Sequence, residues 1–128
     1  MRKLLLDSHV LIWFFENDAR LPVPTRTIIE DLENEVCISI ASFWEIAIKK
    51  SLSKLTLKKT IAEMFTECRN QQIEVLQISQ EEIEAVETMP RHHGDPFDRI
   101  IIATCLNLHF EVVSIDGQFD AYPVKRVW

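Results

Sequence analysis

The sequence of 128 residues is poor in glycine and has no motif that would wrap phosphates. Only Gly94 and Gly117 are present, which excludes a G-x-G-x-x-G fingerprint and a glycine-rich nucleotide loop. The same scarcity excludes a flexible glycine-rich linker. There is also no internal repeat and no low-complexity segment. The length therefore suits one domain over residues 1–128.

Cysteines are few, and long apolar runs are absent. Cys37, Cys68 and Cys105 are far apart and form no C-x-x-C pair, which excludes a disulfide framework and a zinc knuckle. No apolar stretch approaches the ~20 residues that span a bilayer. The run Met1–Leu6 resembles the start of a secretory signal, but Asp7 interrupts it and no small-residue cleavage site follows. We therefore expect a cytoplasmic protein without membrane contacts.

Positive charge is in deficit, with 14 Lys and Arg against 20 Asp and Glu and a net charge of −6. A chain of this charge does not attract nucleic acid overall, so RNA binding would need local cations. The excess acids fall in two stretches that we expect to form solvated helix faces: Glu30, Asp31, Glu33, Glu35 and Glu81, Glu82, Glu84, Glu87. Five lysines predict a solvated face or, alternatively, a patch that contacts phosphates: Lys49, Lys50, Lys54, Lys58 and Lys59.

The chain does contain a regular alternation of short strands and helices. The apolar and β-branched segments predict strands at 3–7, 36–40, 73–78, 111–114 and 124–127. Between them we expect helices at 8–15, 24–34, 43–51, 60–71, 80–89 and 96–108. This alternation indicates an α/β fold with a mostly parallel central sheet.

Three helix starts carry recognisable capping signals. Ser42 and Ser79 are each followed three residues later by a glutamate, which predicts capping boxes at Ser42–Glu45 and Ser79–Glu82. Asp95 precedes a proline, a pattern that favours an N-cap followed by proline at the first helical position.

Five acids fall where a parallel sheet would place a ligand site. In open α/β sheets, ligands bind outside the carboxyl ends of the strands, and Asp7 and Asp116 each follow a predicted strand. Glu45 begins the helix after the second strand, and Asp95 and Asp98 begin the last helix. Several carboxylates gathered there would repel each other unless a divalent cation bound or some stayed protonated. Carboxylate oxygens suit Mg²⁺ or Mn²⁺, and Mg²⁺ takes substrate phosphates as further ligands, which points to phosphoryl chemistry.

Each acid also has a purely structural interpretation. Asp95 and Glu45 are explained by helix capping, Asp98 by the positive end of its helix dipole, and Asp116 by the turn formed with the glycine that follows it. Asp7 is the hardest to explain in this way, because it lies between two apolar runs and burying an unpaired carboxylate is costly.

Four segments in order resemble the motifs of the PIN-domain family: Leu5–Trp13, Ser42–Ala47, Gly94–Ala103 and Ser114–Phe119. In this sequence the first motif contains His9 and the third contains Asp95–Arg99, and these forms of the motifs are similar to those of bacterial VapC-type toxins of type II toxin–antitoxin pairs. The resemblance covers essentially the whole chain and implies a three-layer α/β/α PIN-like domain.

The resemblance further implies a Mg²⁺-dependent endoribonuclease, with Mn²⁺ as a possible substitute, that hydrolyses RNA phosphodiester bonds with a metal-activated water. It assigns both metal binding and catalysis to Asp7, Glu45, Asp98 and Asp116, and leaves open whether one or two ions bind. It also implies a small DNA-binding antitoxin as partner and a homodimer.

Auxiliary roles are expected for four residues near the proposed site: Ser8, Asp95, Arg99 and Ser114. The two serines match positions where the family carries a hydroxyl beside the site. Arg99 is expected to pair with a site carboxylate or to contact the phosphate. We expect His93 and its neighbour His92 in a solvent-facing loop rather than at a metal, since Mg²⁺ prefers oxygen ligands.

Two alternatives remain at this point. One is a non-catalytic PIN-like module that only binds RNA or a protein. The other is a phosphoacceptor receiver domain, which is disfavoured because the third predicted strand ends in Gln77–Ser79 without the aspartate that such a domain requires.

Overall fold

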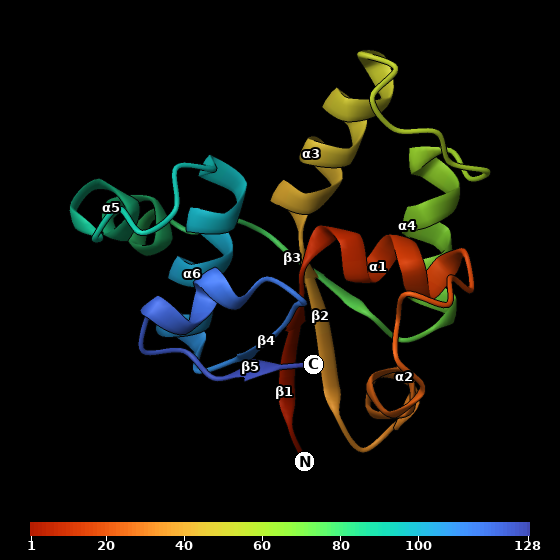
Figure 1. Cartoon of the computed structure of the whole chain (residues 1–128), viewed down its shortest axis with the longest axis horizontal. Helices are drawn as coiled ribbons and strands as arrows, with labels where there is room; N and C mark the ends of the chain where they lie inside the picture. Colours follow the sequence, from red (N-terminus) through yellow and green to blue (C-terminus); the bar gives the residue numbers. More distant parts are fainter.

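The computed structural model describes all 128 residues, and strands alternate with helices along most of the chain (Figure 1). The elements are β1 (Lys3–Leu6), α1 (Ser8–Phe15), α2 (Val23–Glu30), β2 (Glu35–Ser39), α3 (Ile40–Ser51), α4 (Ile61–Asn70), β3 (Glu74–Leu76), α5 (Gln80–Thr88), α6 (Pro96–Leu108), β4 (Glu111–Val113), the 3₁₀ turn η1 (Gly117–Ala121) and β5 (Arg126–Val127).

The five strands form one parallel sheet in the order β3-β2-β1-β4-β5. β1 is central, with Leu5 opposite Cys37 of β2 on one side and Val112 of β4 on the other. Leu4, Leu5 and Leu6 are fully buried, because a parallel sheet is covered on both faces. This explains why the first strand is an unbroken apolar run.

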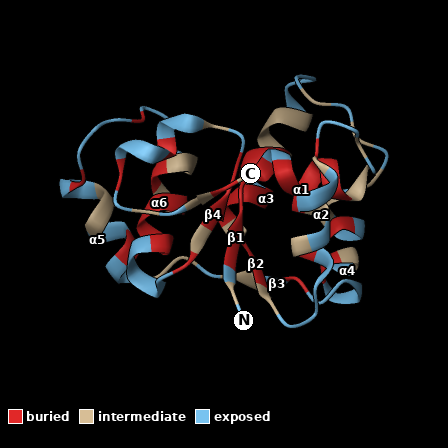
Figure 2. Ribbon diagram, turned by 60° about the horizontal axis from the view of Figure 1, so that its bottom comes forward, coloured by how far each residue is buried: buried red, intermediate tan, exposed pale blue.

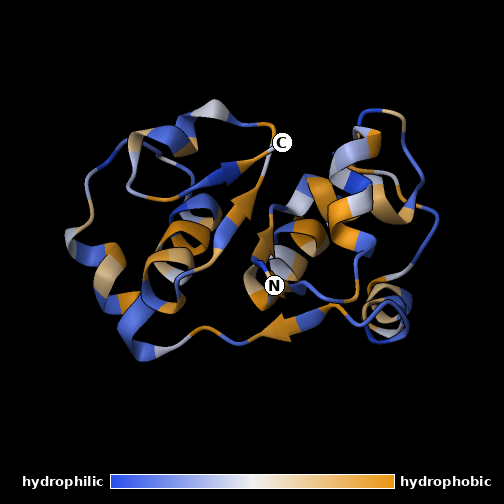
Figure 3. Cartoon of the chain, turned by 90° about the horizontal axis from the view of Figure 1, so that it is seen from below, coloured by the Kyte–Doolittle hydropathy of each residue, from blue (hydrophilic) through white to orange (hydrophobic).

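Helices cover the two faces of the sheet and give it two hydrophobic cores. Leu4 and Leu6 pack with residues of α1, α2, α3 and α4, whereas Leu5 packs with residues of α6 and η1. The buried residues lie on the sheet and on the helix sides that face it (Figure 2), and the hydrophilic residues lie mainly on the outer helix surfaces and loops (Figure 3). The expected three-layer α/β/α architecture is confirmed.

The predicted capping box at Ser42–Glu45 is wrong. β2 ends at Ser39, whose Oγ accepts the hydrogen bond of Ala41 N at 3.1 Å, so α3 begins at Ile40. Ser42 therefore lies inside the first turn, where its hydroxyl is buried without a hydrogen-bond partner. Glu45 therefore does not cap the helix, and its carboxylate can interact with other residues.

Ser79 and Asp95 are N-caps as predicted, but the capping box at Ser79–Glu82 is incomplete, because the Glu82 carboxylate accepts from Ser79 Oγ and not from the Ser79 backbone N–H. Ser79 Oγ accepts the hydrogen bond of Glu82 N at the start of α5, and Asp95 accepts from Phe97 N and Asp98 N at the start of α6. The second helix is shorter than expected, since α2 ends at Glu30 rather than near residue 34. None of the helices has the length and apolarity needed to cross a bilayer.

One acid of the predicted solvated faces is buried. Glu82 is 2% exposed, and its carboxylate accepts hydrogen bonds from Ser79 Oγ and Thr104 Oγ1. Glu82 therefore links α5 to α6, and its carboxylate lies between the two helices instead of on the surface.

Candidate active site

The four predicted acids come together at the carboxyl ends of the three middle strands. Asp7 follows β1, Glu45 lies on α3 after β2, Asp116 follows β4, and Asp98 lies in the first turn of α6. β2 and β3 lie on one side of β1 in the sheet, and β4 and β5 lie on the other side. The acids therefore lie at the point where the direction of the strand order reverses. That is the place where open α/β sheets bind ligands.

Asp7 is buried, with 8% of its surface exposed, and hydroxyl and amide groups orient it. Its Oδ1 accepts from Ser8 N at 2.7 Å, and its Oδ2 accepts from Ser114 Oγ at 2.7 Å. Burial raises the pKa of Asp7, the charge of Glu45 raises it further, and the hydrogen bonds oppose the shift. The carboxylate is thus held in one orientation in an environment that disfavours its charge.

Glu45 is also buried, at 6% exposed, and is held by two donors. Ser8 Oγ donates to Oε1 at 2.7 Å, and Lys49 Nζ donates to Oε2 at 2.8 Å. The hydrogen bond to Glu45 raises the pKa of Lys49, so this ammonium stays charged. Ser8 therefore connects Asp7 to Glu45, and Lys49 offsets one of the negative charges.

The other lysines of the predicted basic stretch are farther from this arrangement or otherwise occupied. Lys50 Nζ donates to the carbonyl of Lys59, whereas Lys54 and Lys58 are exposed on the segment after α3. RNA binding by these lysines stays a prediction.

Asp98 lies at the start of α6 and faces the other acids of the site. Its pKa rises from 3.8 to about 7, first because of burial and then because of the charges of Asp7, Asp95, Glu45 and Asp116. Its carboxylate accepts no hydrogen bond within the chain, and the His93 imidazole lies beside it, with Nε2 4.0 Å from Oδ2. Asp98 therefore has free oxygen lone pairs facing a negatively charged cluster.

Asp116 is the most exposed member, with 36% of its side chain accessible. Its Oδ1 accepts from Gln118 N at 2.9 Å, and its backbone N–H donates to Ser114 Oγ at 3.0 Å. Its Oδ2 lies 3.4 Å from His93 Nε2. Ser114 thus contacts both Asp7 and Asp116, as Ser8 contacts both Asp7 and Glu45.

Asp95 and Arg99 take structural positions. Asp95 is exposed and uses Oδ1 to cap α6, while its charge adds to the field at Asp98. Arg99 does not pair with a carboxylate, in contrast to the expectation. Its guanidinium is buried and donates only to backbone carbonyls before α6, because Arg99 lies on the side of the helix that faces this segment.

His93 is the site residue that the sequence interpretation missed. We expected a solvent-facing loop, but His93 is 3% exposed and lies beside Asp98 and Asp116. The ring of His93 is covered by Phe119 and Tyr122, which come from a later segment of the sequence. A histidine directly before a motif rich in acids was the only local signal.

The donor set fits a hard divalent cation. Mg²⁺ and Mn²⁺ prefer carboxylate oxygens, and the cluster provides four carboxylates with one basic partner, Lys49. Asp98, Asp116 and the neighbouring His93 also offer one possible ligand atom each, and these three atoms lie within 4.8 Å of one another. The elevated pKa of Asp98 shows that the negative charge there lacks compensation, and a bound cation would supply it.

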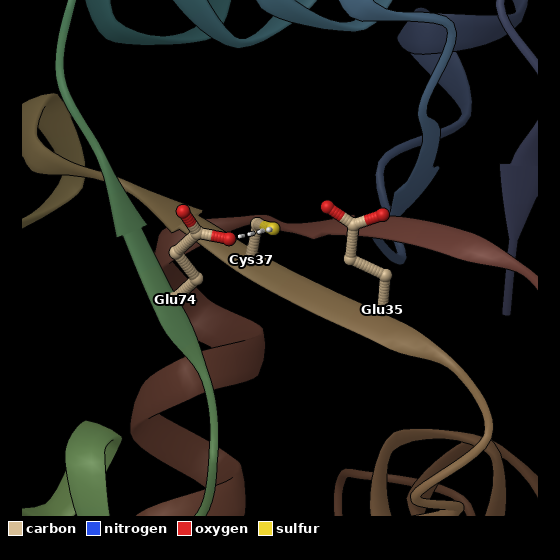
Figure 4. A group of neighbouring side chains, drawn as sticks. All are labelled: Glu35, Cys37 and Glu74. Carbon is tan, nitrogen blue, oxygen red and sulfur yellow. Dashed lines mark hydrogen bonds between the residues drawn. The ribbon is translucent and has the colours of Figure 1, made fainter.

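A second group of possible ligands fits a metal poorly. Glu35, Cys37 and Glu74 lie together near the amino ends of β2 and β3 (Figure 4). Burial and the two carboxylates raise the pKa of the Cys37 thiol to about 12, so the sulfur keeps its proton and is hydrogen-bonded to Glu74 at 4.0 Å. Because the thiolate is the ligand form of cysteine, we assign no metal to this group.

The chain is similar to known proteins over almost its whole length. The PIN domain family model matches residues 4–125. The chain is 25% identical over 132 residues to Ribonuclease VapC22 of Mycobacterium tuberculosis, with 100% of both proteins covered.

Solved structures show the same fold. VapBC2 from Rickettsia felis, bound to a promoter DNA fragment, superposes with a TM-score of 0.72 at 11% identity, covering 98% of this chain and 97% of that one. A toxin–antitoxin complex from Klebsiella pneumoniae gives 0.65 at 19% identity, covering 98% and 96%. Since the family model spans nearly the entire sequence, the chain belongs to the PIN-domain family.

Proposed function

We propose that the protein is a Mg²⁺-dependent endoribonuclease and the toxin of a type II toxin–antitoxin pair, acting through one PIN-like domain over residues 1–128. The observation that carries this proposal is the convergence of four acids from separate parts of the chain around Asp98, whose pKa is raised to about 7. A protein without chemistry at this place has little reason to keep carboxylates that repel each other.

The relatives support the nuclease and toxin parts of the proposal. The full-length relative is named a ribonuclease, and the structural neighbours are VapBC or toxin–antitoxin assemblies. We therefore propose RNA as the substrate and a small DNA-binding antitoxin as the partner. A homodimer is proposed from the resemblance to the VapC family.

The site residues fall into two groups in this reaction, the acids that would bind the cation and the serines that orient those acids. Asp7, Glu45, Asp98 and Asp116 would hold the cation, and Ser8 and Ser114 fix the orientation of the acids they contact. When bound there, the cation would polarise the phosphodiester and lower the pKa of a water beside it.

Proton transfer and charge balance fall to the side chains. A carboxylate of the site would take the proton of the attacking water, and Asp98 is the acid whose oxygens accept no hydrogen bond within the chain. Lys49 compensates for part of the charge of Glu45 and brings one positive charge to the place where a phosphate would approach.

The test is cleavage of a structured RNA by the purified protein. We expect cleavage with Mg²⁺ that stops with a chelator and leaves 5′-phosphate and 3′-hydroxyl ends. Asp98→Asn and Asp7→Asn should each lower the rate by at least about 100-fold, the scale of losing a group that works directly in the chemistry. Glu74→Gln, a change in the other acidic group, is the matched control and should cleave normally.

Cleavage that persists in chelator, or in both aspartate variants, would contradict the proposal. Tight binding of RNA without any cleavage by the native protein would instead favour a non-catalytic binding module.

A further inference from the structure

His93 lies beside the proposed metal site with its ring in a fixed position. It belongs to the segment between α5 and α6, and only 2% of its side chain is exposed. Its Nε2 is 3.4 Å from Asp116 Oδ2 and 4.0 Å from Asp98 Oδ2. One edge of the imidazole thus faces two acids that come from different elements.

Packing and backbone bonds, rather than the acids, determine where this ring lies. The ring contacts Phe119 with centroids 4.9 Å apart and Tyr122 with centroids 5.5 Å apart. The His93 backbone N–H donates to Tyr122 Oη at 2.9 Å, and that hydroxyl donates to the Pro90 carbonyl. The His93 carbonyl accepts from Arg99 Nη1 at 3.4 Å. His93 can therefore impose an orientation on its neighbours.

The two ring nitrogens have opposite surroundings, and this favours one of the two neutral tautomers over the other. Nδ1 is buried and has no hydrogen-bond partner in the protein, whereas Nε2 faces carboxylate oxygens. A proton on Nδ1 would leave a buried donor unpaired and turn the Nε2 lone pair toward the carboxylates, and both effects are costly. A proton on Nε2 gives a donor to Asp116 and leaves only a bare acceptor at Nδ1.

The same asymmetry argues against His93 as a metal ligand. A ligating histidine binds through one nitrogen and donates its other ring N–H to an acceptor that fixes the tautomer. Here Nδ1 has no such acceptor. In addition, hard cations such as Mg²⁺ prefer oxygen.

We propose that His93 is a positioning residue, which donates from Nε2–H to Asp116 Oδ2 and fixes this carboxylate toward the metal site without binding the metal. Asp116 needs such a partner most, because it is the most exposed of the four acids and lies on the loop before η1. With Gln118 N on Oδ1 and His93 on Oδ2, both oxygens are oriented. This inference rests on the proposed metal site.

The tautomer can be observed in the native protein by ¹⁵N NMR of the imidazole. We expect His93 as the Nε2–H form, both in chelator and at saturating Mg²⁺. A change to the Nδ1–H form on addition of Mg²⁺ would identify His93 as a ligand and would overturn the proposal.

The positioning role is tested by Mn²⁺ affinity, measured by titration calorimetry on folded variants. His93→Leu removes the donor and should weaken Mn²⁺ binding by about 10-fold or more, the usual effect of losing a group that orients a ligand. His93→Gln retains an N–H at a similar distance from the backbone and should restore most of the affinity. The exposed neighbour gives the matched control, and His92→Gln should bind Mn²⁺ like the native protein.

Native affinity in folded His93→Leu, or an equal loss in His93→Gln and His93→Leu, would overturn the proposal. If His93→Leu does not fold, the glutamine variant and the NMR measurement still decide. Failure of the native protein to cleave RNA would contradict the proposed nuclease but not this role, because neither the Mn²⁺ affinity nor the tautomer depends on cleavage.

Discussion

At the scale of single residues, Asp98 is the acid of the site whose negative charge is compensated least by hydrogen bonds within the chain. It begins a buried helix, accepts no hydrogen bond, and faces Asp7, Glu45 and Asp116. The two serines relieve the neighbouring acids, since Ser8 and Ser114 donate to Asp7, Glu45 or both. Asp98 has no such donor, so a bound cation would supply the compensation that the serines give to the other acids.

This difference predicts how the stability of the metal-free protein depends on pH. The pKa of Asp98 is about 7 in the folded chain against an ordinary 3.8, so between these values the folded state binds a proton that the unfolded state releases. The free energy of unfolding therefore falls as pH rises from about 4 to about 7. Asp7, whose pKa is also raised, adds to the same trend.

Thermal melts in chelator at pH 5 and pH 7.5 measure this effect. Asp98→Asn should melt at a higher temperature than the native protein at the higher pH and should show a weaker pH dependence. Glu87→Gln, which changes an exposed acid of α5, is the control. Equal pH dependence in Asp98→Asn and the native protein would show that Asp98 is not the destabilising charge.

At the scale of elements, Arg99 connects the start of α6 to the end of α5. Its Nη1 donates to the carbonyls of Pro90 and His93, and its Nη2 donates to those of Val86 and Met89, at 2.8 to 3.4 Å. The planar guanidinium satisfies four carbonyls, which belong to the last turn of α5, its C-cap and the segment that follows it. It thereby orders the residues that lead to His93.

Arg99→Lys should therefore destabilise the protein although the charge is kept. A lysine ammonium cannot reproduce the fork of a guanidinium, and the buried carbonyls lose their donors. We expect the free energy of unfolding to fall by about 2–3 kcal/mol, the cost of leaving buried polar groups unpaired, as measured by urea denaturation. Arg20→Lys, at an exposed ion pair with Asp18, should change stability far less. An unchanged midpoint for Arg99→Lys would contradict this role.

Local sequence predicted most elements because their signals lie within a few residues. The first helix was expected at 8–15 and is found there, and the Asp95 cap with its proline begins α6 as expected. The start of α3 was misplaced because Ser39 and Ser42 are both good capping residues, and only the end of β2 decides between them.

At the scale of the whole molecule, the features that could not be predicted depend on distant partners. The burial of His93 requires Phe119 and Tyr122, and that of Glu82 requires Thr104 on α6. No local pattern contains these pairs. The gathering of the acids was predictable, because parallel strands bring their carboxyl ends to one edge of the sheet.

The most direct test of the metal site is anomalous diffraction from crystals grown with Mn²⁺. We expect anomalous density among Asp7, Glu45, Asp98 and Asp116, with carboxylate oxygens roughly 2.0–2.3 Å from the metal, and no contact from His93. Density confined to Glu35, Cys37 and Glu74, or none at saturating Mn²⁺, would contradict the assignment of the four acids as the metal centre.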